Sequence, residues 1–364
     1  MKSSAILAGV LVALAAPLAL PAGARADELP REYRDSVNKG LEWLVKQQHS
    51  DGHWEAAGAQ YPLTMTGLSG MALLMEGSTI REGKYSANIR KAVDWLVARS
   101  MPNGMLGNPN IPGEAGRYMY GHGFALLFLS SVYGEEDEGD RRRKLEDVLT
   151  RAVQFTGKAQ TTRGGWGYIS AADGSDFDEG SVTITQVQAV RAARNAGISV
   201  PKEIIDKAVK YLKDSTGSDG GVIYSLANGG GGPGRPALTA AAISCGFSAG
   251  EYGSKEVAGW FKYVQQQVPL NLGGGGRFGH DEYTHYYLAQ AIYVLGDDGW
   301  SKMFPKERDG LTWSKYKKAT FDGIVRSQGA DGGWTGGMIG PVFISAIHLS
   351  ILQLDNAALP IYQR

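Results

Sequence analysis

The chain lacks the features that mark several large classes of protein. Cys245 is the one cysteine, so no intramolecular disulfide can form and the fold must rest on a packed core. The 37 basic and 37 acidic residues balance, which gives no support for a nucleic-acid partner. A membrane span needs about 20 apolar residues, and no such run follows the first residues. We therefore expect neither nucleic-acid binding nor a transmembrane segment in the mature chain.

The N-terminal segment has the pattern of a secretory signal peptide. Lys2 supplies the positive start, residues 5–20 are largely apolar, and Ala24-Arg25-Ala26 is typical of a cleavage site. A membrane anchor is the alternative, but the run is short and Pro17 interrupts it. We expect a signal peptide over 1–26 and one folded domain over 27–364. The mature protein would then be exported, to the periplasm or the extracellular space.

A glycine followed two residues later by a large apolar residue occurs six times at nearly even intervals. The glycines are 52, 60, 56, 56 and 56 residues apart. The pairs are Gly52/Trp54, Gly104/Leu106, Gly164/Trp166, Gly220/Val222, Gly276/Phe278 and Gly332/Trp334. Such a period indicates one supersecondary unit repeated six times.

Each repeat contains two segments with helical periodicity but different composition. The segments before the glycines are charged and amphipathic, which is typical of surface helices. They cover 32–48, 86–99, 141–160, 201–214, 254–267 and 313–328. Those after the glycines are poor in charge, which indicates buried helices. They cover 63–75, 123–133, 181–196, 237–247, 283–295 and 342–354.

Both terminal repeats are as apolar as the middle ones, whereas an open solenoid needs polar caps at its ends. We therefore predict an all-α fold, an (α/α)6 toroid in which six helical hairpins form a closed ring. The inner segments also carry many Thr, Ser and Gln residues. If half of these point inward, the central cavity is polar and wet.

Three of the glycine signals extend to the pattern Q-x3-G-x-W. They begin at Gln48, Gln160 and Gln328. This pattern resembles the QW repeat of squalene and oxidosqualene cyclases. The chain is also similar to protein prenyltransferase subunits in Gly164-Gly165-Trp166-Gly167. The resemblance covers the mature chain and implies the terpenoid cyclase and prenyltransferase fold. We expect the glutamine amide to bind free carbonyls at the end of an outer helix, which is a structural role.

Acidic residues precede the third inner segment. Asp176-Phe177-Asp178-Glu179 resembles the D-x-D-D motif of class II terpenoid cyclases, except that Glu179 replaces the last aspartate. The resemblance implies Asp178 as proton donor, with Asp176 and Glu179 beside it. Clustered carboxylates can keep one of their number protonated. The alternative is that these acids cap the helix that follows.

A second polar group of residues precedes the fifth inner segment. Glu282 and His285 are spaced i, i+3, as metal ligands are in some helical bundles. Protein prenyltransferases bind zinc through Asp-x-Cys, which is absent here because Ile243 stands two residues before Cys245. We therefore expect no metal and no cofactor, and assign Glu282 and His285 to ligand binding at a polar mouth.

Three further residues are candidates for the same mouth. Tyr120 and His122 precede the second inner segment, where the imidazole could act as a base, a ligand, or a packing residue. Arg235 follows a glycine-rich stretch and could bind an anion at the next helix, although the stretch lacks the Lys-Ser/Thr of a P-loop. The simpler interpretation of that stretch is a connector.

Two classes of function are compatible with these features. The first is an exported binding or interaction protein that holds a small molecule, a lipid or a glycan in the central cavity. The second is an enzyme. It would be a cyclase with Asp178 as the acid, or a polysaccharide-active enzyme with two opposed carboxylates such as Glu179 and Glu282. A wet cavity and export from the cytosol favour the binding protein.

Overall fold

The computed structural model describes residues 29–363, except 112, 228, 272–280 and 338. The signal-peptide prediction, the pair Gly276/Phe278 and His280 lie outside the described residues. Within them, none of the helices has the length and apolar character needed to cross a membrane.

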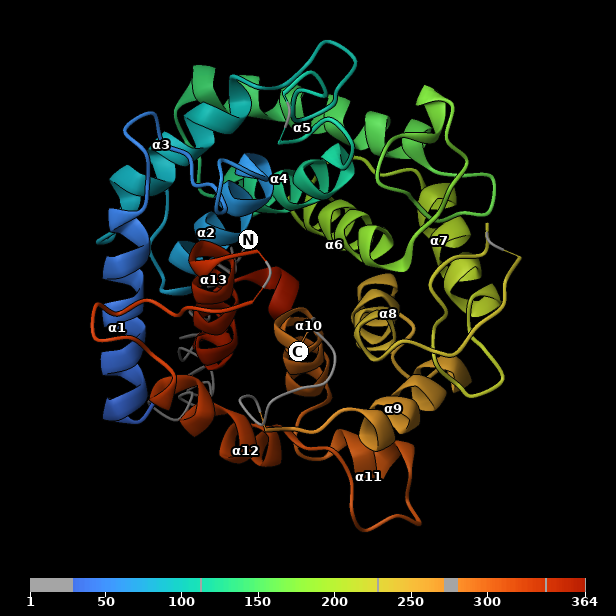
Figure 1. Cartoon of the computed structure of the whole chain (residues 1–364). Helices are drawn as coiled ribbons and strands as arrows, with labels where there is room; N and C mark the ends of the chain where they lie inside the picture. The colour runs from blue at the N-terminus through green and yellow to red at the C-terminus, as the bar shows by residue number, and fades with distance from the viewer. Residues whose placement is uncertain (1–28, 112, 228, 272–280, 338, 364) are drawn as a thin grey trace, which may run out of the picture.

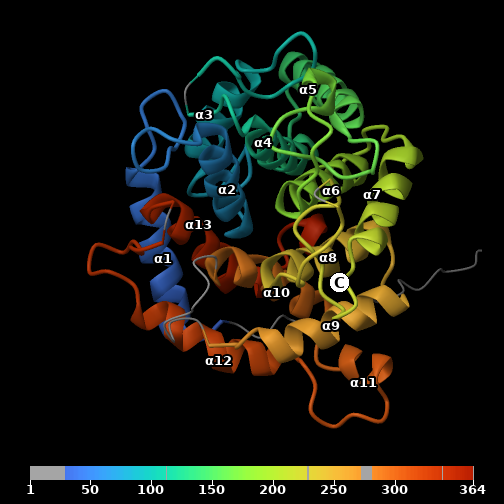
Figure 2. The ribbon, with the colours of Figure 1, turned by 45° about the vertical axis from the view of Figure 1, so that its right-hand side comes forward.

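The described chain forms two concentric layers of helices, as expected for a toroid (Figure 1). The outer helices are α1 (Arg31–Lys46), α3 (Ser86–Val97), α5 (Gly139–Ala159), α7 (Lys202–Asp214), α9 (Lys255–Gln267) and α12 (Trp313–Arg326). The inner helices are α2 (Pro62–Met75), α4 (Tyr118–Tyr133), α6 (Gly180–Asn195), α8 (Pro236–Ala249), α10 (Asp281–Leu295) and α13 (Pro341–Leu352). The short helix α11 (Gly299–Met303) lies at the outside of the ring, and its place is clear in both views (Figures 1 and 2).

Charge separates the two layers as the composition predicted. Every residue of α2 is buried, whereas α1 buries one face and exposes the other. Helix α4 begins five residues before the predicted start at Gly123, and so includes Gly121. Both positions are occupied by glycine because neighbouring inner helices approach the backbone too closely for a side chain. A Cβ on Gly121 would lie 2.8 Å from Leu63, and one on Gly123 would lie 2.5 Å from Thr185.

The three glutamines of the Q-x3-G-x-W pattern join neighbouring repeats. The amide of Gln160 donates to the carbonyl of Gly164 in its own turn and to that of Ile204 in the next outer helix, at 2.8 and 3.0 Å. The indole of Trp166 donates to the carbonyl of Thr156 at 2.8 Å. These residues therefore have a structural role, as expected, but the carbonyls that they bind lie in the turn and in the next outer helix rather than at the end of their own helix. Gln328 makes the corresponding bond to Ser36, which closes the last repeat onto the first.

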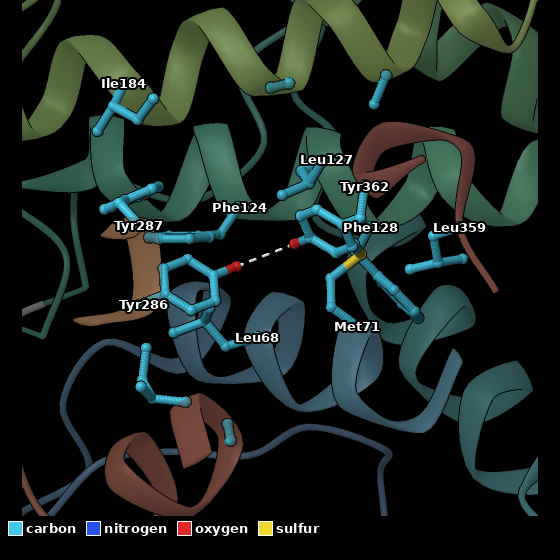
Figure 3. Packing of buried hydrophobic residues seen from close by; sticks show 14 of the residues in the cluster. Leu68, Met71, Phe124, Leu127, Phe128, Ile184, Tyr286, Tyr287, Leu359 and Tyr362 are labelled. Carbon is cyan, nitrogen blue, oxygen red and sulfur yellow. Dashed lines mark hydrogen bonds between the residues drawn. The ribbon is translucent and has the colours of Figure 1, made fainter. Parts of the chain in front are cut away.

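Side chains fill the centre of the ring where a wet cavity was expected (Figure 3). Aromatic and aliphatic residues of the inner helices meet there, together with Tyr362 from the C-terminal segment. The hydroxyls of Tyr286 and Tyr362 are 3.1 Å apart. The expectation of a polar lumen is wrong for the described residues, because many inner polar side chains point outward. Thr66 and Thr183, for example, accept the backbone N–H of Trp54 and Trp166 in the turns.

Candidate functional site

The N-terminal ends of three inner helices meet around Glu179, which precedes α6. The hydroxyl of Tyr120, on α4, contacts the Ser181 hydroxyl and lies 3.4 Å from a carboxylate oxygen of Glu179. The hydroxyl of Tyr283, on α10, donates to the backbone carbonyl of Ser181 at 2.8 Å. Tyr120 and Glu179, both expected at this mouth, are thus brought together. Tyr283 was not predicted.

Glu179 is both a helix cap and an unusual acid. Its backbone is extended, and its Oε2 accepts the N–H groups of Ser181 and Val182 at 3.1 Å, as an N-cap does. The residue is only 2 % exposed. Burial raises the pKa of the Glu179 carboxyl above its ordinary value, although the hydrogen bonds from Ser181, Val182 and Tyr120 act to lower it. Burial, rather than a neighbouring carboxylate, is therefore the cause that favours the protonated form.

Asp178 holds a loop. Its side chain is fully buried, and its two oxygens accept the backbone N–H groups of Leu226 and Ala227 at 2.7 and 3.1 Å. The guanidinium of Arg163 lies 3.7 Å away. These contacts fasten the segment that precedes α8 to the start of α6. The cyclase-like role of Asp178 as proton donor stays a prediction, and in this geometry both of its oxygens are engaged by backbone donors.

Asp176 lies on the exposed surface and caps the turn of the third repeat. Its oxygens accept the backbone N–H and the hydroxyl of Thr162 at 2.7 and 2.5 Å, and Arg163 lies 3.1 Å away. The hydrogen bond from the Thr162 hydroxyl is the main cause that lowers the pKa of Asp176. Asp176 and Asp178 thus share Arg163 as a neighbour, but the hydrogen bonds of the three acids go to three different parts of the chain.

An aromatic surface continues outward from Tyr120. We call the half-buried residues Tyr120, Tyr168, Phe177, Tyr224 and Tyr283 the aromatic surface. The ring of Phe177 lies 6.3 Å from that of Tyr168 and 6.4 Å from that of Tyr224. The hydroxyls of Tyr168 and Tyr224 are 2.5 Å apart.

Two exposed arginines border this surface. The guanidinium of Arg117 lies 4.9 Å from the centre of the Tyr168 ring, and that of Arg235 lies 5.0 Å from the centre of the Tyr224 ring. Such cation–π contacts fix the direction of an arginine. Among the described residues, no carboxylate forms an ion pair with either guanidinium. Arg235 thus lies at the mouth where it was expected.

Sequence reasoning missed Tyr168 and Tyr224, although their spacing contains a signal. Tyr168 follows Trp166 by two residues, and Tyr224 follows Val222 by two, so the tyrosines are one 56-residue repeat apart. Residues at equal positions in adjacent repeats lie side by side in a toroid. The other repeats have no tyrosine at this position, since Ala56, Asn108, His280 and Gly336 stand there.

His122 does not lie at the mouth, which corrects the expectation that it binds a ligand. It is fully buried, and its Nδ1 accepts the backbone N–H of Leu106 at 3.1 Å. Its Nε2 lies 2.9 Å from the hydroxyl of Thr156. Burial lowers the pKa of His122 to about 3. The imidazole therefore takes the place that Thr66 and Thr183 occupy in other repeats, which is the packing role left open above.

Glu282 and His285 do not converge on one ligand. His285 is buried, and its Nδ1 lies 3.0 Å from the hydroxyl of Tyr316 on the outer helix α12. Burial lowers the pKa of His285 to about 4. The imidazole is thus directed toward the outer layer, so the expectation that it lines the mouth is corrected. Glu282 is half-buried at the start of α10.

The opposite end of the ring holds a small polar cavity of about 40 Å³. Gln188, Ser244, Gln290 and Tyr362 are among its lining residues. The amide of Gln188 donates to that of Gln290 at 2.7 Å across this space. A cavity of this size holds ordered water but no terpenoid, so the aromatic surface is the better candidate for a ligand.

Comparisons with known proteins agree with this fold. No family model matches the chain. Human lanosterol synthase (Homo sapiens) is 34% identical over 90 residues, which are 24% of this chain and 12% of that enzyme. The chain therefore spans a small part of the length of that relative.

Several solved structures resemble the whole ring. The type II terpene cyclase MstE from Scytonema, in complex with geranylgeranyl dihydroxybenzoate, has a TM-score of 0.55 at 15% identity, covering 90% of this chain and 98% of that one. A glycosidase has a TM-score of 0.57 at 13% identity with the same coverage. A protein from Actinoplanes has a TM-score of 0.51 at 16% identity, covering 90% and 99%. These likenesses confirm the predicted fold, which cyclases and a glycosidase share.

Proposed function

Starting from the fold of type II terpene cyclases, we propose that this protein binds an acidic glycan at the aromatic surface. The observation that carries the proposal is the pair Arg117 and Arg235, held over the hydrogen-bonded Tyr168 and Tyr224 without a carboxylate partner among the described residues. Arginine presents a fork of donors that suits carboxylates and sulfates. Tyrosines supply flat apolar faces with polar edges, which suits a sugar ring.

The packed centre of the ring supports a site at the mouth rather than in the barrel. A central site would need the displacement of buried rings such as Tyr286 and Tyr287. The aromatic surface needs no such change, because its rings are already partly exposed. We also propose export of the protein, on the basis of residues 1–26. An exported protein of this kind would meet glycans rather than cytosolic prenyl diphosphates.

Isothermal titration calorimetry with three classes of ligand tests this proposal. An acidic oligosaccharide should bind, and a neutral one of equal length should bind at least tenfold more weakly. An aryl carboxylate tests whether an anionic group on an aromatic ring is enough for binding without a sugar. Arg117→Gln and Arg235→Gln should each weaken binding by about tenfold or more, since a hydrogen bond to a charged group is worth about 1.5–3 kcal/mol. Arg326→Gln is the matched control, because Arg326 is exposed on an outer helix. Equal affinity for acidic and neutral glycans would contradict the proposal.

A second candidate function is acid catalysis by Glu179, which its raised pKa favours. Four contacts from Ser181, Val182 and Tyr120 converge on Oε2, which leaves Oε1 as the oxygen for a transferable proton. Glycoside hydrolysis uses a general acid whose pKa is raised, together with a second carboxylate. Glu179→Gln keeps the size of the side chain and removes the acidic carboxyl proton. If the protein cleaves glycans, this variant should bind them as the parent does and release no product.

A further inference from the structure

The turn of the first repeat contains two histidines and a glutamate that face one another. The Nε2 of His49 lies 3.6 Å from an oxygen of Glu55, and the Nε2 of His53 lies 3.4 Å from the other oxygen. One ligand atom from each of the three side chains lies within 4.8 Å of those of the other two. The two imidazole rings are stacked, with their centres 4.3 Å apart. His49 is exposed and the other two are partly buried, so the group is open to solvent.

We propose that His49, His53 and Glu55 form a binding site for a divalent transition-metal ion, best matched by Zn²⁺. Two imidazoles and one carboxylate are a common zinc ligand set that leaves a fourth position for water. Zinc bonds of about 2.0–2.1 Å in a tetrahedron place the ligand atoms roughly 3.3–3.4 Å apart. The His53–Glu55 distance is therefore already that of a bound site, whereas His49 meets the other oxygen of Glu55. Binding of one ion by both histidines requires the two stacked rings to turn so that their nitrogens point to the same place.

A second carboxylate fixes the direction of one histidine. The Nδ1 of His53 lies 2.6 Å from an oxygen of Asp51, which leaves Nε2 directed toward Glu55. Metal-binding histidines commonly donate their second N–H to a carboxylate in this way. The other oxygen of Asp51 accepts the indole N–H of Trp95 at 3.0 Å, and the His53 ring stacks on Trp95 at 4.8 Å. His53 is thus held by α3 as well as by its own turn.

The fold does not require histidines at these positions, as the other repeats show. The backbone N–H of His49 donates to the carbonyl of His53 at 2.8 Å. The same bond joins Thr161 to Gly165 at 2.9 Å and Gly329 to Gly333 at 2.7 Å. Met101 and Met105, and Gly217 and Gly221, make this bond too, each at 2.8 Å. Five described turns therefore share one backbone geometry, and only the first has histidines at these positions.

Asp331 provides a close internal control for Asp51. It stands immediately before Gly332, as Asp51 stands before Gly52, and it accepts the indole N–H of Trp43 at 2.9 Å. Its other oxygen, however, accepts a backbone N–H, that of Gly333 at 3.2 Å. Asp331 therefore has the structural contact of Asp51 but no histidine to orient.

Equilibrium dialysis of the tag-free full chain against Zn²⁺ tests the site, with Co²⁺ as a spectroscopic probe. The parent should bind one Zn²⁺ per chain, and Co²⁺ should give the visible absorption of a tetrahedral complex. His49→Thr, His53→Gly and Glu55→Thr install residues found at these positions in other repeats, namely Thr161, Gly165 and Thr335. They should keep the fold and lose this binding.

Substitution of Asp51 and of Asp331 distinguishes two effects, the orientation of a metal-binding histidine and the stability of the turn. Asp51→Asn should weaken Zn²⁺ binding by about 10–100-fold, as loss of an outer partner of a ligating histidine does. Asp331→Asn should leave it unchanged. The proposal is overturned if the parent binds no Zn²⁺, or if it binds the ion no more tightly than the folded His53→Gly variant. An octahedral Co²⁺ spectrum that these substitutions do not alter would overturn it as well.

Discussion

The side-chain amide of Gln328 donates to the backbone carbonyl of Ser36, 292 positions earlier in the chain, at 2.9 Å. The hydroxyl of Ser36 returns a bond of 2.7 Å to the carbonyl oxygen of the same amide. Two bonds therefore join the turn that follows the last outer helix to the first outer helix, and the hydroxyl of Tyr33 on α1 also donates to Asp322 on α12 at 2.6 Å. The same amide also binds Gly332 in its own turn, as Gln160 binds Gly164. Closure of the ring thus uses the contact that joins neighbouring repeats elsewhere.

Gln328→Leu should destabilise the protein at least as much as Gln160→Leu does, since it also removes the acceptor of the Ser36 hydroxyl. Each substitution removes the donor from two carbonyls, and an unsatisfied buried polar group costs about 1–3 kcal/mol. Urea unfolding followed by circular dichroism measures both losses. If the ends of the chain were not in stable contact, Gln328→Leu would cost much less than Gln160→Leu.

The architecture was predictable because it depends on features repeated along the chain. Composition separates buried from exposed helices, and the glycine spacing gives the number of repeats. The site was less predictable, since its residues come from four repeats and their environments depend on packing. Nothing local distinguishes the buried Glu179 from the exposed Asp176, three residues earlier. In other repeats a threonine or serine accepts the corresponding backbone N–H of the turn. Because a histidine has this role in the second repeat, no pattern in the sequence showed that His122 is a packing residue rather than a residue of the mouth.

Gly164→Ala should be much more destabilising than Gly197→Ala. Both glycines have a positive φ, of 93° and 90° respectively, which costs other residues about 1–3 kcal/mol. A Cβ on Gly164 would also lie 2.3 Å from the carbonyl oxygen of Lys207, whereas one on Gly197 meets nothing within 4 Å. Relieving that overlap should add about 1–3 kcal/mol to the destabilisation of the Gly164→Ala variant. Comparable urea midpoints for the two variants would show that the turn does not press on the next outer helix.

Acid should destabilise the protein through its buried histidines. Burial lowers the pKa of His122 and His348 to about 3 and that of His285 to about 4, from an ordinary value of 6.5. The unfolded chain therefore binds protons on these rings at a higher pH than the folded chain does. Their contribution to stability is complete above about pH 6.5 and is lost as the pH falls toward 4 and then 3. Glu179, with its raised pKa, acts in the opposite direction.

The free energy of unfolding at pH 7.5 and pH 5 measures this effect. Each unit of difference in pKa is worth about 1.4 kcal/mol once the pH has passed through it. His122→Gln keeps an acceptor for the Leu106 N–H and removes one titrating group. This variant should lose less stability than the parent between the two pH values. An equal loss in both proteins would exclude His122 as a source of the acid sensitivity.

Asp178→Asn should lower stability by about 1–3 kcal/mol at neutral pH, because it turns one of two acceptor oxygens into a donor that faces a backbone N–H. Glu179→Gln should cost less, since an amide oxygen can still accept the N–H groups of Ser181 and Val182. Hydrogen exchange locates the effect. The amides of Leu226 and Ala227 should lose protection in the Asp178 variant and keep it in the Glu179 variant. Unchanged protection at both amides would mean that Asp178 does not fasten this loop, and would leave its carboxyl available for the proton transfer that the D-x-D-D resemblance implies.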